Sequence, residues 1–170
     1  MKLNIFVLLI VSVLFGGCGT MQFTPQEYPL RDGLIPPMKV SGNVTIKNAQ
    51  DSKEAAIIYS YGGSKLASDY NKITQVMVDQ STKELKKNGQ IISSPKGKSI
   101  DLKVTYLLST YKFMYWKSEL KYTATLGNGK KLDKTVTHGS GILAQDLNGC
   151  IAESVIDLFN DTAVRNYLAE

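Results

Sequence analysis

Residues 99–138 read SIDLKVTYLL STYKFMYWKS ELKYTATLGN GKKLDKTVTH, and the fold class follows from their pattern. Hydrophobic and polar residues alternate along the first part, which indicates a strand with one buried face. The hydrophobic members are Ile100, Leu102, Val104, Tyr106 and Leu108. The alternation changes phase at Tyr111. Because a slip of one residue turns every side chain to the other face, we expect a bulge or a turn between Ser109 and Ser118.

Two further strands complete an antiparallel meander. The second strand alternates again, with Leu120, Tyr122, Ala124 and Leu126 on one face. Gly127-Asn128-Gly129 is a strong hairpin turn, and residues 132–138 run back beside it.

The clearest helix of the chain comes next. Its hydrophobic residues recur at helical spacing without a gap longer than four residues. They are Leu143, Leu147, Cys150, Ile151, Val155, Leu158 and Phe159. Asn160 or Asp161 then caps a short final helix that carries Val164, Tyr167 and Leu168.

Upstream of the meander we expect two strands and one helix. Residues 38–47 alternate as one half-buried strand, and residues 55–61 form a second strand. The helix runs to about Asn88. Ser64 or Ser68 can cap it, and it is most secure from Asp69 onward. Ile91-Ile92 is a brief strand.

These elements predict an α+β fold over residues 38–170. We expect a small, mostly antiparallel sheet of about 4–5 strands with two main amphipathic helices packed on one face.

Residues 1–20, MKLNIFVLLI VSVLFGGCGT, have a different character. Lys2 precedes an apolar run over residues 3–15, and two small residues follow it. This is the pattern of a secretory signal peptide. The apolar run is shorter than the about 20 residues that span a bilayer.

Residues 14–18, LFGGC, resemble the lipobox of bacterial lipoproteins. The resemblance implies cleavage before Cys18 and a diacylglycerol on its sulfur, and two or more acyl chains anchor a protein stably. In the Gram-negative pattern an Asp after the cysteine retains a lipoprotein in the inner membrane. Gly19 in that place favours the periplasmic face of the outer membrane. An uncleaved anchor helix or an ordinary signal peptide is the alternative.

Residues 18–37 then form the lipidated cysteine and a tether, after a signal peptide over residues 1–17. Four of the chain's five prolines lie in this stretch, and proline disfavours helix. We expect an extended segment that holds the domain away from the membrane surface.

Cys150 has no partner within the chain if Cys18 is acylated. Its place on the apolar stripe of the helix predicts a buried, unreactive thiol.

Charge is unevenly distributed along a chain of net charge +5. Residues 96–134 hold nine lysines against three acids, whereas residues 135–170 hold Arg165 against five acids. A basic face suits anionic lipid or glycan phosphates. A solvated sheet face with lysines at its edges is the other interpretation.

Signals for catalysis are sparse, and we expect no enzyme activity, no cofactor and no metal. His138 is the only histidine, and at a strand end it is typical of a surface or packing residue. The sequence has no Cys/His cluster with zinc spacing, no phosphate-binding glycine loop and no G-x-S-x-G motif. We expect no nucleic-acid partner for an exported lipoprotein.

An aromatic group interleaved with lysines is the most suggestive surface feature. Such a group can stack on sugars or form a protein interface, or its alternate members can be the core face of the sheet. The core interpretation is favoured for Tyr106, Phe113 and Tyr122, whereas Trp116 falls at the expected turn. The candidate surface for an anionic ligand or a partner is Lys112, Trp116, Lys117 and Lys121.

The whole chain resembles the YajG-type bacterial lipoproteins. The matching segments are the lipobox, Val44-Thr45-Ile46, Leu85-Lys86-Lys87-Asn88-Gly89, Asp101-Leu102-Lys103-Val104, Asn128-Gly129-Lys130-Lys131-Leu132 and residues 147–168. The family implies a lipid-anchored periplasmic domain at the outer membrane without a defined activity, and Cys18 is the one functional residue it transfers.

The expected function is therefore that of a non-enzymatic, lipid-anchored binding or structural protein. Its expected partners are the membrane, through acylated Cys18, and another envelope protein or a glycolipid. Lipoproteins that assist lipopolysaccharide assembly also place two helices on a small sheet. An accessory role in the assembly of lipopolysaccharide or outer-membrane proteins is the alternative.

Overall fold

The predicted meander consists of β7 (Lys98–Lys112), β8 (Tyr115–Leu126) and β9 (Lys131–Ser140). β8 pairs antiparallel with both of its neighbours. The structure is a computed structural model that describes residues 19–95 and 97–170. The predicted signal peptide (residues 1–17) and Cys18 lie outside the described residues.

The phase of β7 changes earlier than the sequence predicts. A register shift between Val104 and Tyr106 adds one residue to this strand. As a result Leu107 is buried, while Tyr106 and Leu108 are only partly buried, so their prediction as core residues was wrong.

The expected turn lies between β7 and β8. Phe113 and Met114 connect Lys112 to its partner Tyr115. Phe113 is 87% exposed, so its interpretation as a core residue was wrong, whereas the interpretation of Tyr122 is confirmed because only 1% of it is exposed.

The sheet contains more strands than expected. Six of its seven strands run in the order β1-β5-β4-β7-β8-β9, and the seventh, β3, pairs with the first part of β7. The strand predicted over residues 55–61 is confirmed as β4 (Ala55–Tyr61), and β3 (Val44–Asn48) comes from the second half of the strand predicted over residues 38–47. The strands that the sequence did not predict are β1 (Thr20–Gln22) and β5 (Ser64–Asp69). β4 pairs antiparallel with β5, and three shorter pairings are parallel.

Two predicted boundaries were wrong for local backbone reasons. Residues 38–47 do not form one strand, because the chain turns at Gly42, where φ is +77°. β2 (Met38–Ser41) pairs instead with β6 (Gly89–Ile92) in a separate two-stranded sheet. Residues 64–68 belong to β5 and not to the helix, because Gly62 and Gly63 both take positive φ and close a β4–β5 hairpin.

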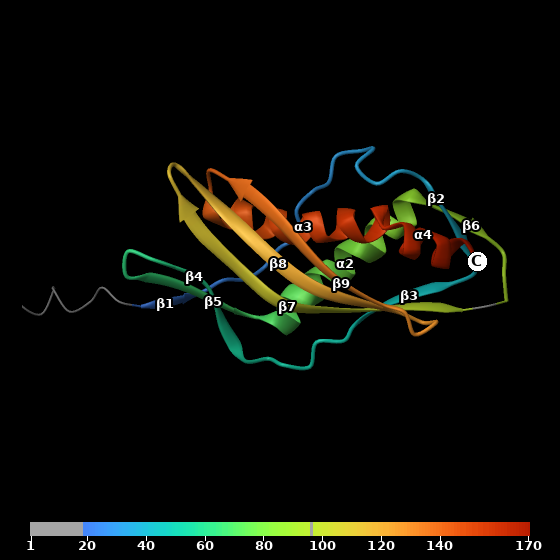
Figure 1. Cartoon of the computed structure of the whole chain (residues 1–170), viewed down its shortest axis with the longest axis horizontal. Helices are drawn as coiled ribbons and strands as arrows, with labels where there is room; N and C mark the ends of the chain where they lie inside the picture. The colour runs from blue at the N-terminus through green and yellow to red at the C-terminus, as the bar shows by residue number, and fades with distance from the viewer. Residues whose placement is uncertain (1–18, 96) are drawn as a thin grey trace, which may run out of the picture.

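Helices α2 (Tyr70–Asn88) and α3 (Leu143–Asn160) lie on one face of the sheet, and α4 (Thr162–Ala169) continues from α3 after a bend (Figure 1). Asp69 caps α2 by accepting a hydrogen bond from the Lys72 amide at 2.7 Å. Asp161 caps α4 through the amides of Ala163 and Val164. The predicted α+β architecture, with its mostly antiparallel sheet under amphipathic helices, is confirmed.

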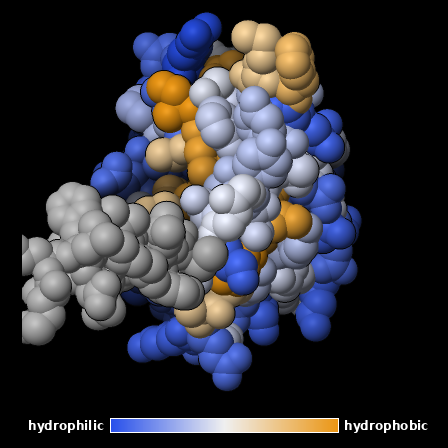
Figure 2. Space-filling view, turned by 90° about the vertical axis from the view of Figure 1, so that its left-hand side faces the viewer, coloured by the Kyte–Doolittle hydropathy of each residue, from blue (hydrophilic) through white to orange (hydrophobic). Residues whose placement is uncertain are grey.

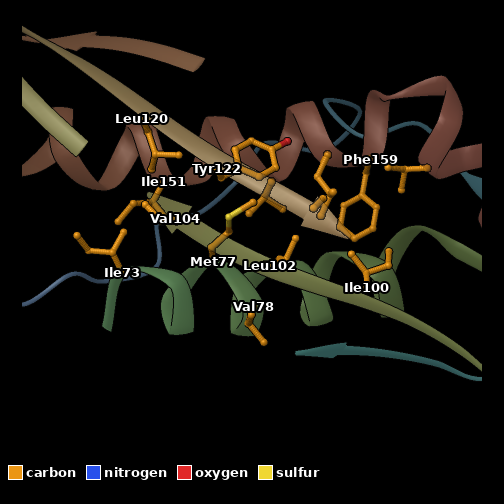
Figure 3. Close-up of a cluster of buried hydrophobic side chains, with 14 of the residues drawn as sticks. Ile73, Met77, Val78, Ile100, Leu102, Val104, Leu120, Tyr122, Ile151 and Phe159 are labelled. Carbon is orange, nitrogen blue, oxygen red and sulfur yellow. The ribbon is translucent and has the colours of Figure 1, made fainter. Parts of the chain in front are cut away.

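The core lies between the helices and the inner face of the meander. Figure 3 shows side chains from β7, β8, α2 and α3 that point toward one another in this layer. The fully buried members include Ile73, Met77, Ile100, Leu102, Leu120, Tyr122, Ile151 and Phe159.

Residues 23–37, which we call the strap, run over the helices on the side away from the sheet (Figure 1). Gln80 donates a hydrogen bond to the Tyr28 carbonyl at 2.6 Å, and Arg165 donates to the Pro37 carbonyl at 2.6 Å. Ile35 is buried. The predicted tether is thus packed on the domain over residues 19–37, where β1 joins the sheet edge and the strap joins the helices.

Candidate functional site

The predicted lysines lie on the outer face of β7 and β8, which points away from the helices. Strand pairing fixes this arrangement, because Lys112 is opposite Tyr115, Lys117 opposite Thr110 and Lys121 opposite Tyr106. All three lysines are exposed. We call Lys112, Lys117 and Lys121 the lysine face.

Neighbouring side chains limit the charge of the lysine face. Lys121 lies 3.3 Å from a carboxylate oxygen of Glu119 and 5.2 Å from the centre of the Tyr106 ring. A shallow hollow of about 210 Å³ opens there, lined by Tyr106, Leu108, Thr110, Lys112, Lys117, Ser118, Glu119 and Thr137. Cationic and acidic groups therefore share this surface.

Trp116 lies on the opposite face of the sheet from the lysine face. Its ring centre is 5.4 Å from that of Tyr111, which in turn is 4.9 Å from that of Tyr61. These three rings form a row across β8, β7 and β4. The predicted surface of three lysines and Trp116 is therefore divided between two faces.

The sequence did not predict the apolar end of the molecule, which we define as Tyr61, Phe113, Met114, Tyr115 and Ile142. Phe113 and Met114 are 87% and 75% exposed, and the other three are exposed as well. Figure 2 views the molecule from this end, where hydrophobic residues interrupt the hydrophilic surface. The signal was the run Phe113-Met114-Tyr115 at an expected turn, a place where polar residues and glycine are usual.

The buried titratable groups hold the layers together. Asp146, in the first turn of α3, is fully buried and accepts hydrogen bonds from the hydroxyls of Ser109 and Ser118 at 2.6 and 2.5 Å. This contact fixes α3 on β7 and β8.

Cys150 is buried and free, so its predicted burial is confirmed. Burial foremost, and the nearby Asp146 carboxylate as well, raise the pKa of the Cys150 thiol well above its usual range. A thiol that stays protonated is a poor nucleophile.

His138 packs on α3 at a position where Gly149 leaves room for the imidazole. A Cβ on Gly149 would overlap the ring. The Nδ1 atom of His138 lies 3.6 Å from an oxygen of Glu153, beside a groove of about 470 Å³ between the strap and α3. Within residues 19–95 and 97–170, no group of three or more His, Cys, Asp or Glu side chains is placed to hold a metal ion.

Comparison with known proteins places the chain in no family. No family model matches it, and no curated protein matches it significantly. Lipoprotein GNA1162 from Neisseria meningitidis is 11% identical, with a TM-score of 0.32, over 72% of this chain and 96% of that one. The hypothetical protein CT253 from Chlamydia trachomatis is 8% identical, with a TM-score of 0.33, over 74% of this chain and 98% of that one. Likeness at this level shows neither a shared fold nor a shared function.

In the described part of the chain, no helix combines the length and the apolar character needed to cross a bilayer.

Proposed function

We propose that this chain is a lipid-anchored, non-enzymatic lipoprotein of the bacterial envelope. The observation that carries the proposal is the lipobox-like sequence of residues 14–18 directly after an apolar signal-peptide core. Acylated Cys18 is the anchor, and the α+β domain is the part that binds or supports another envelope component. Gly19 and the resemblance to YajG-type lipoproteins favour the periplasmic face of the outer membrane in a Gram-negative bacterium.

The start of the described chain sets how closely an anchor at Cys18 would hold the domain. Thr20 is already paired with Lys65 in the sheet, two residues after Cys18. Two extended residues reach about 7 Å. Acyl chains on Cys18 would therefore keep the domain close to the bilayer.

The contacts of the ionisable core residues support a non-enzymatic role. The Asp146 carboxylate accepts from two serine hydroxyls, and the Tyr122 hydroxyl donates to Asp157 at 2.7 Å. Burial raises the pKa of Tyr122, as it does that of Cys150. These groups serve as fixed contacts between the sheet and the helices.

Intact mass and cell fractionation test the anchor together. We expect the detergent-extracted protein to have the mass of residues 18–170 plus acyl chains. Cys18→Ser should lose the acyl mass and leave the membrane fraction, because no chain then enters the bilayer.

Cys150→Ser is the matched control, because it removes the other cysteine and should keep both the acyl mass and the membrane location. A wild-type mass of all 170 residues, or of a cleaved chain without acyl groups, would contradict the proposed anchor.

A second candidate function is an accessory role in the assembly of lipopolysaccharide or outer-membrane proteins. The lysine face favours it, because three exposed cations on one sheet face can meet lipid A phosphates. Charge reversal of Lys112, Lys117 and Lys121 to Glu should weaken binding of the acylated protein to lipopolysaccharide. The control reverses three exposed lysines elsewhere, Lys39, Lys53 and Lys86. Equal affinity of the two variants would count against this role.

A further inference from the structure

The turn at the tip of the β7–β8 hairpin exposes two large hydrophobic side chains. Phe113 and Met114 form the entire connection between the paired residues Lys112 and Tyr115. In soluble hairpins such two-residue connections favour asparagine and glycine. Here the most exposed position of the hairpin is apolar instead.

Met114 also occupies a backbone conformation that does not suit it. Its φ is +66°, the only positive φ of a non-glycine residue in the described chain. The side chain of an L-residue is strained in this region, which glycine enters freely. An apolar side chain at a position that is both strained and exposed points to a role outside the packing of the domain.

The tip lies at the end of the molecule where the chain emerges after Cys18. Thr20 pairs with Lys65, next to the β4–β5 turn, and Tyr61 at that turn contacts Tyr111 near the tip. In Figure 1 the β1 strand, the β4–β5 turn and the β7–β8 tip all lie toward the same end. An anchor at Cys18 would bring this end, and not the lysine face as a whole, to the bilayer.

Lysines are the charged residues of the segments that form the tip and its surroundings, and Glu119 lines the hollow beside Lys112 and Lys117. Residues 19–26, 57–68, 105–118 and 139–145 contain no acid, and their charged residues are Lys65, Lys112 and Lys117, which are all exposed. Lysines near a bilayer are attracted by anionic headgroups. Tyrosine is enriched at the membrane interface, where its ring meets acyl chains and its hydroxyl meets water.

We propose that the apolar end docks on an anionic bilayer surface, with Phe113 and Met114 inserted at the headgroup boundary and Lys65, Lys112 and Lys117 facing lipid phosphates. This inference rests on the proposed anchor at Cys18. Docking would fix the orientation of the domain, with the apolar end at the membrane and the opposite end, which carries α4 and β6, farther from the anchoring point (Figure 1).

Tryptophan fluorescence with brominated lipids tests the docking directly. In the acylated protein carrying Trp116→Phe, one tryptophan is placed either at the tip by Phe113→Trp or at the opposite end by Ile91→Trp. Ile91 is a matched site, because it is apolar and 72% exposed on β6. Both proteins are inserted into vesicles of phosphatidylethanolamine and phosphatidylglycerol with brominated acyl chains.

We expect strong quenching and a blue shift for the tryptophan at position 113, and neither for the tryptophan at position 91. Quenching at position 113 should weaken in vesicles of neutral phosphatidylcholine, because the attraction of the lysines is then lost. The acylated wild-type protein gives a second quenching measurement without any substitution, because Trp116 is its only tryptophan and lies beside the tip. We expect partial quenching of Trp116.

Equal quenching at positions 113 and 91 in vesicle-bound, acylated protein would overturn the docking and leave the anchor intact. A tip tryptophan that is unquenched in vesicles but blue-shifted in native membranes would assign the apolar end to a protein partner and also overturn it. The intact mass of the same sample shows whether the anchor is present. A chain whose mass lacks acyl groups and that does not bind the vesicles would show that the anchor itself fails. That result would overturn both proposals.

Discussion

The two ends of the sheet–helix sandwich differ in whether their hydrophobic side chains are buried or exposed. At the end formed by the start of β7, helix α4 closes the core with the chain's own side chains, and Val164 and Leu168 are fully buried. The Tyr167 hydroxyl accepts from the Ser99 amide at 3.1 Å and donates to the Ser99 carbonyl at 3.2 Å. Lys98 donates to the Leu168 carbonyl at 2.8 Å.

At the other end, where β7 turns into β8, the tip extends beyond the helices. Phe113 and Met114 are exposed, and the turn contains the strained Met114. Helix α3 begins at this end without a side-chain cap, because its N-cap residue is Ile142. This difference separates the hydrophobic residues that stabilise the fold from those that the fold leaves exposed, and the exposed ones form the proposed docking surface.

Two phenylalanines give the largest expected contrast between the ends. Phe159→Ala should lower the free energy of unfolding by about 3–5 kcal/mol, because Phe159 is fully buried near α4 and its removal leaves a cavity. Phe113→Ala should change it by less than about 0.5 kcal/mol, because Phe113 is mostly exposed. Urea unfolding followed by circular dichroism measures both. A similar loss for the two variants would contradict the distinction between the ends.

The helix caps give a second contrast. Asp161→Ala should destabilise the protein by about 1–2 kcal/mol, because the carboxylate caps α4 at 2.7 and 3.2 Å and meets Lys134 at 2.5 Å. Ser140→Ala, before α3, should have a smaller effect, because the Ser140 hydroxyl lies 3.3 Å from the Ile142 amide and 3.5 Å from Gln145. Urea unfolding of both variants at neutral pH measures the contrast. Equal losses of stability would mean that the Asp161 cap stabilises the protein no more than the Ser140 contacts do.

The same aspartate makes the closed end sensitive to acid. Partial burial favours its neutral form, but hydrogen bonds from Lys134 and from the amides of Val164 and Ala163 outweigh burial and lower the pKa of Asp161. A pKa below the unfolded value means that the ionised group stabilises the fold above about pH 4 and that this stabilisation is lost as the pH falls through the lowered pKa. The stability difference between wild type and Asp161→Asn should therefore be constant from neutral pH down to about pH 4 and shrink below it. A constant difference across an acid titration of urea unfolding would refute this assignment.

The strained turn gives the smallest effect, and its sign is opposite. Met114→Gly should raise the free energy of unfolding by about 0.5–1 kcal/mol, because relief of positive-φ strain exceeds the entropy that glycine adds to the unfolded chain. Phe113→Gly is the matched control and should destabilise, because the backbone of Phe113 has no positive φ to relieve. The same urea measurements apply, and a destabilised Met114→Gly would mean that the Met114 side chain contributes to packing.

Much of the fold could be predicted because local patterns carried it. The alternation in β8 placed Leu120, Tyr122, Ala124 and Leu126 in the core, where they are buried. Helical spacing predicted α3, and Asp161 was one of the two capping residues predicted for α4. The predicted caps Ser64 and Ser68 of the first helix lie in β5, and Asp69, from which the helix was most secure, is its N-cap. These features depend on neighbours within a few residues, so a single sequence contains them.

Predictions failed where residues distant in sequence decide the structure. The shift after Val104 depends on how β7 pairs with β8. The proline-rich strap takes its path from contacts with Gln80, Asn160 and Arg165, which lie on three different helices. The sequence pattern placed Trp116 and Lys117 within the expected turn, whereas both belong to β8, where consecutive side chains point to opposite faces.

The sequence by itself determined the α+β class, the capped helices and the proposed acylation site, because periodicity, capping residues and the lipobox are local chemical patterns. Only the tertiary structure decided that residues 19–37 pack on the domain and that Phe113 and Met114 lie at the end from which the chain emerges after Cys18. The physical reason is that strand pairing and helix packing join residues far apart in the chain, and these contacts fix both register and direction.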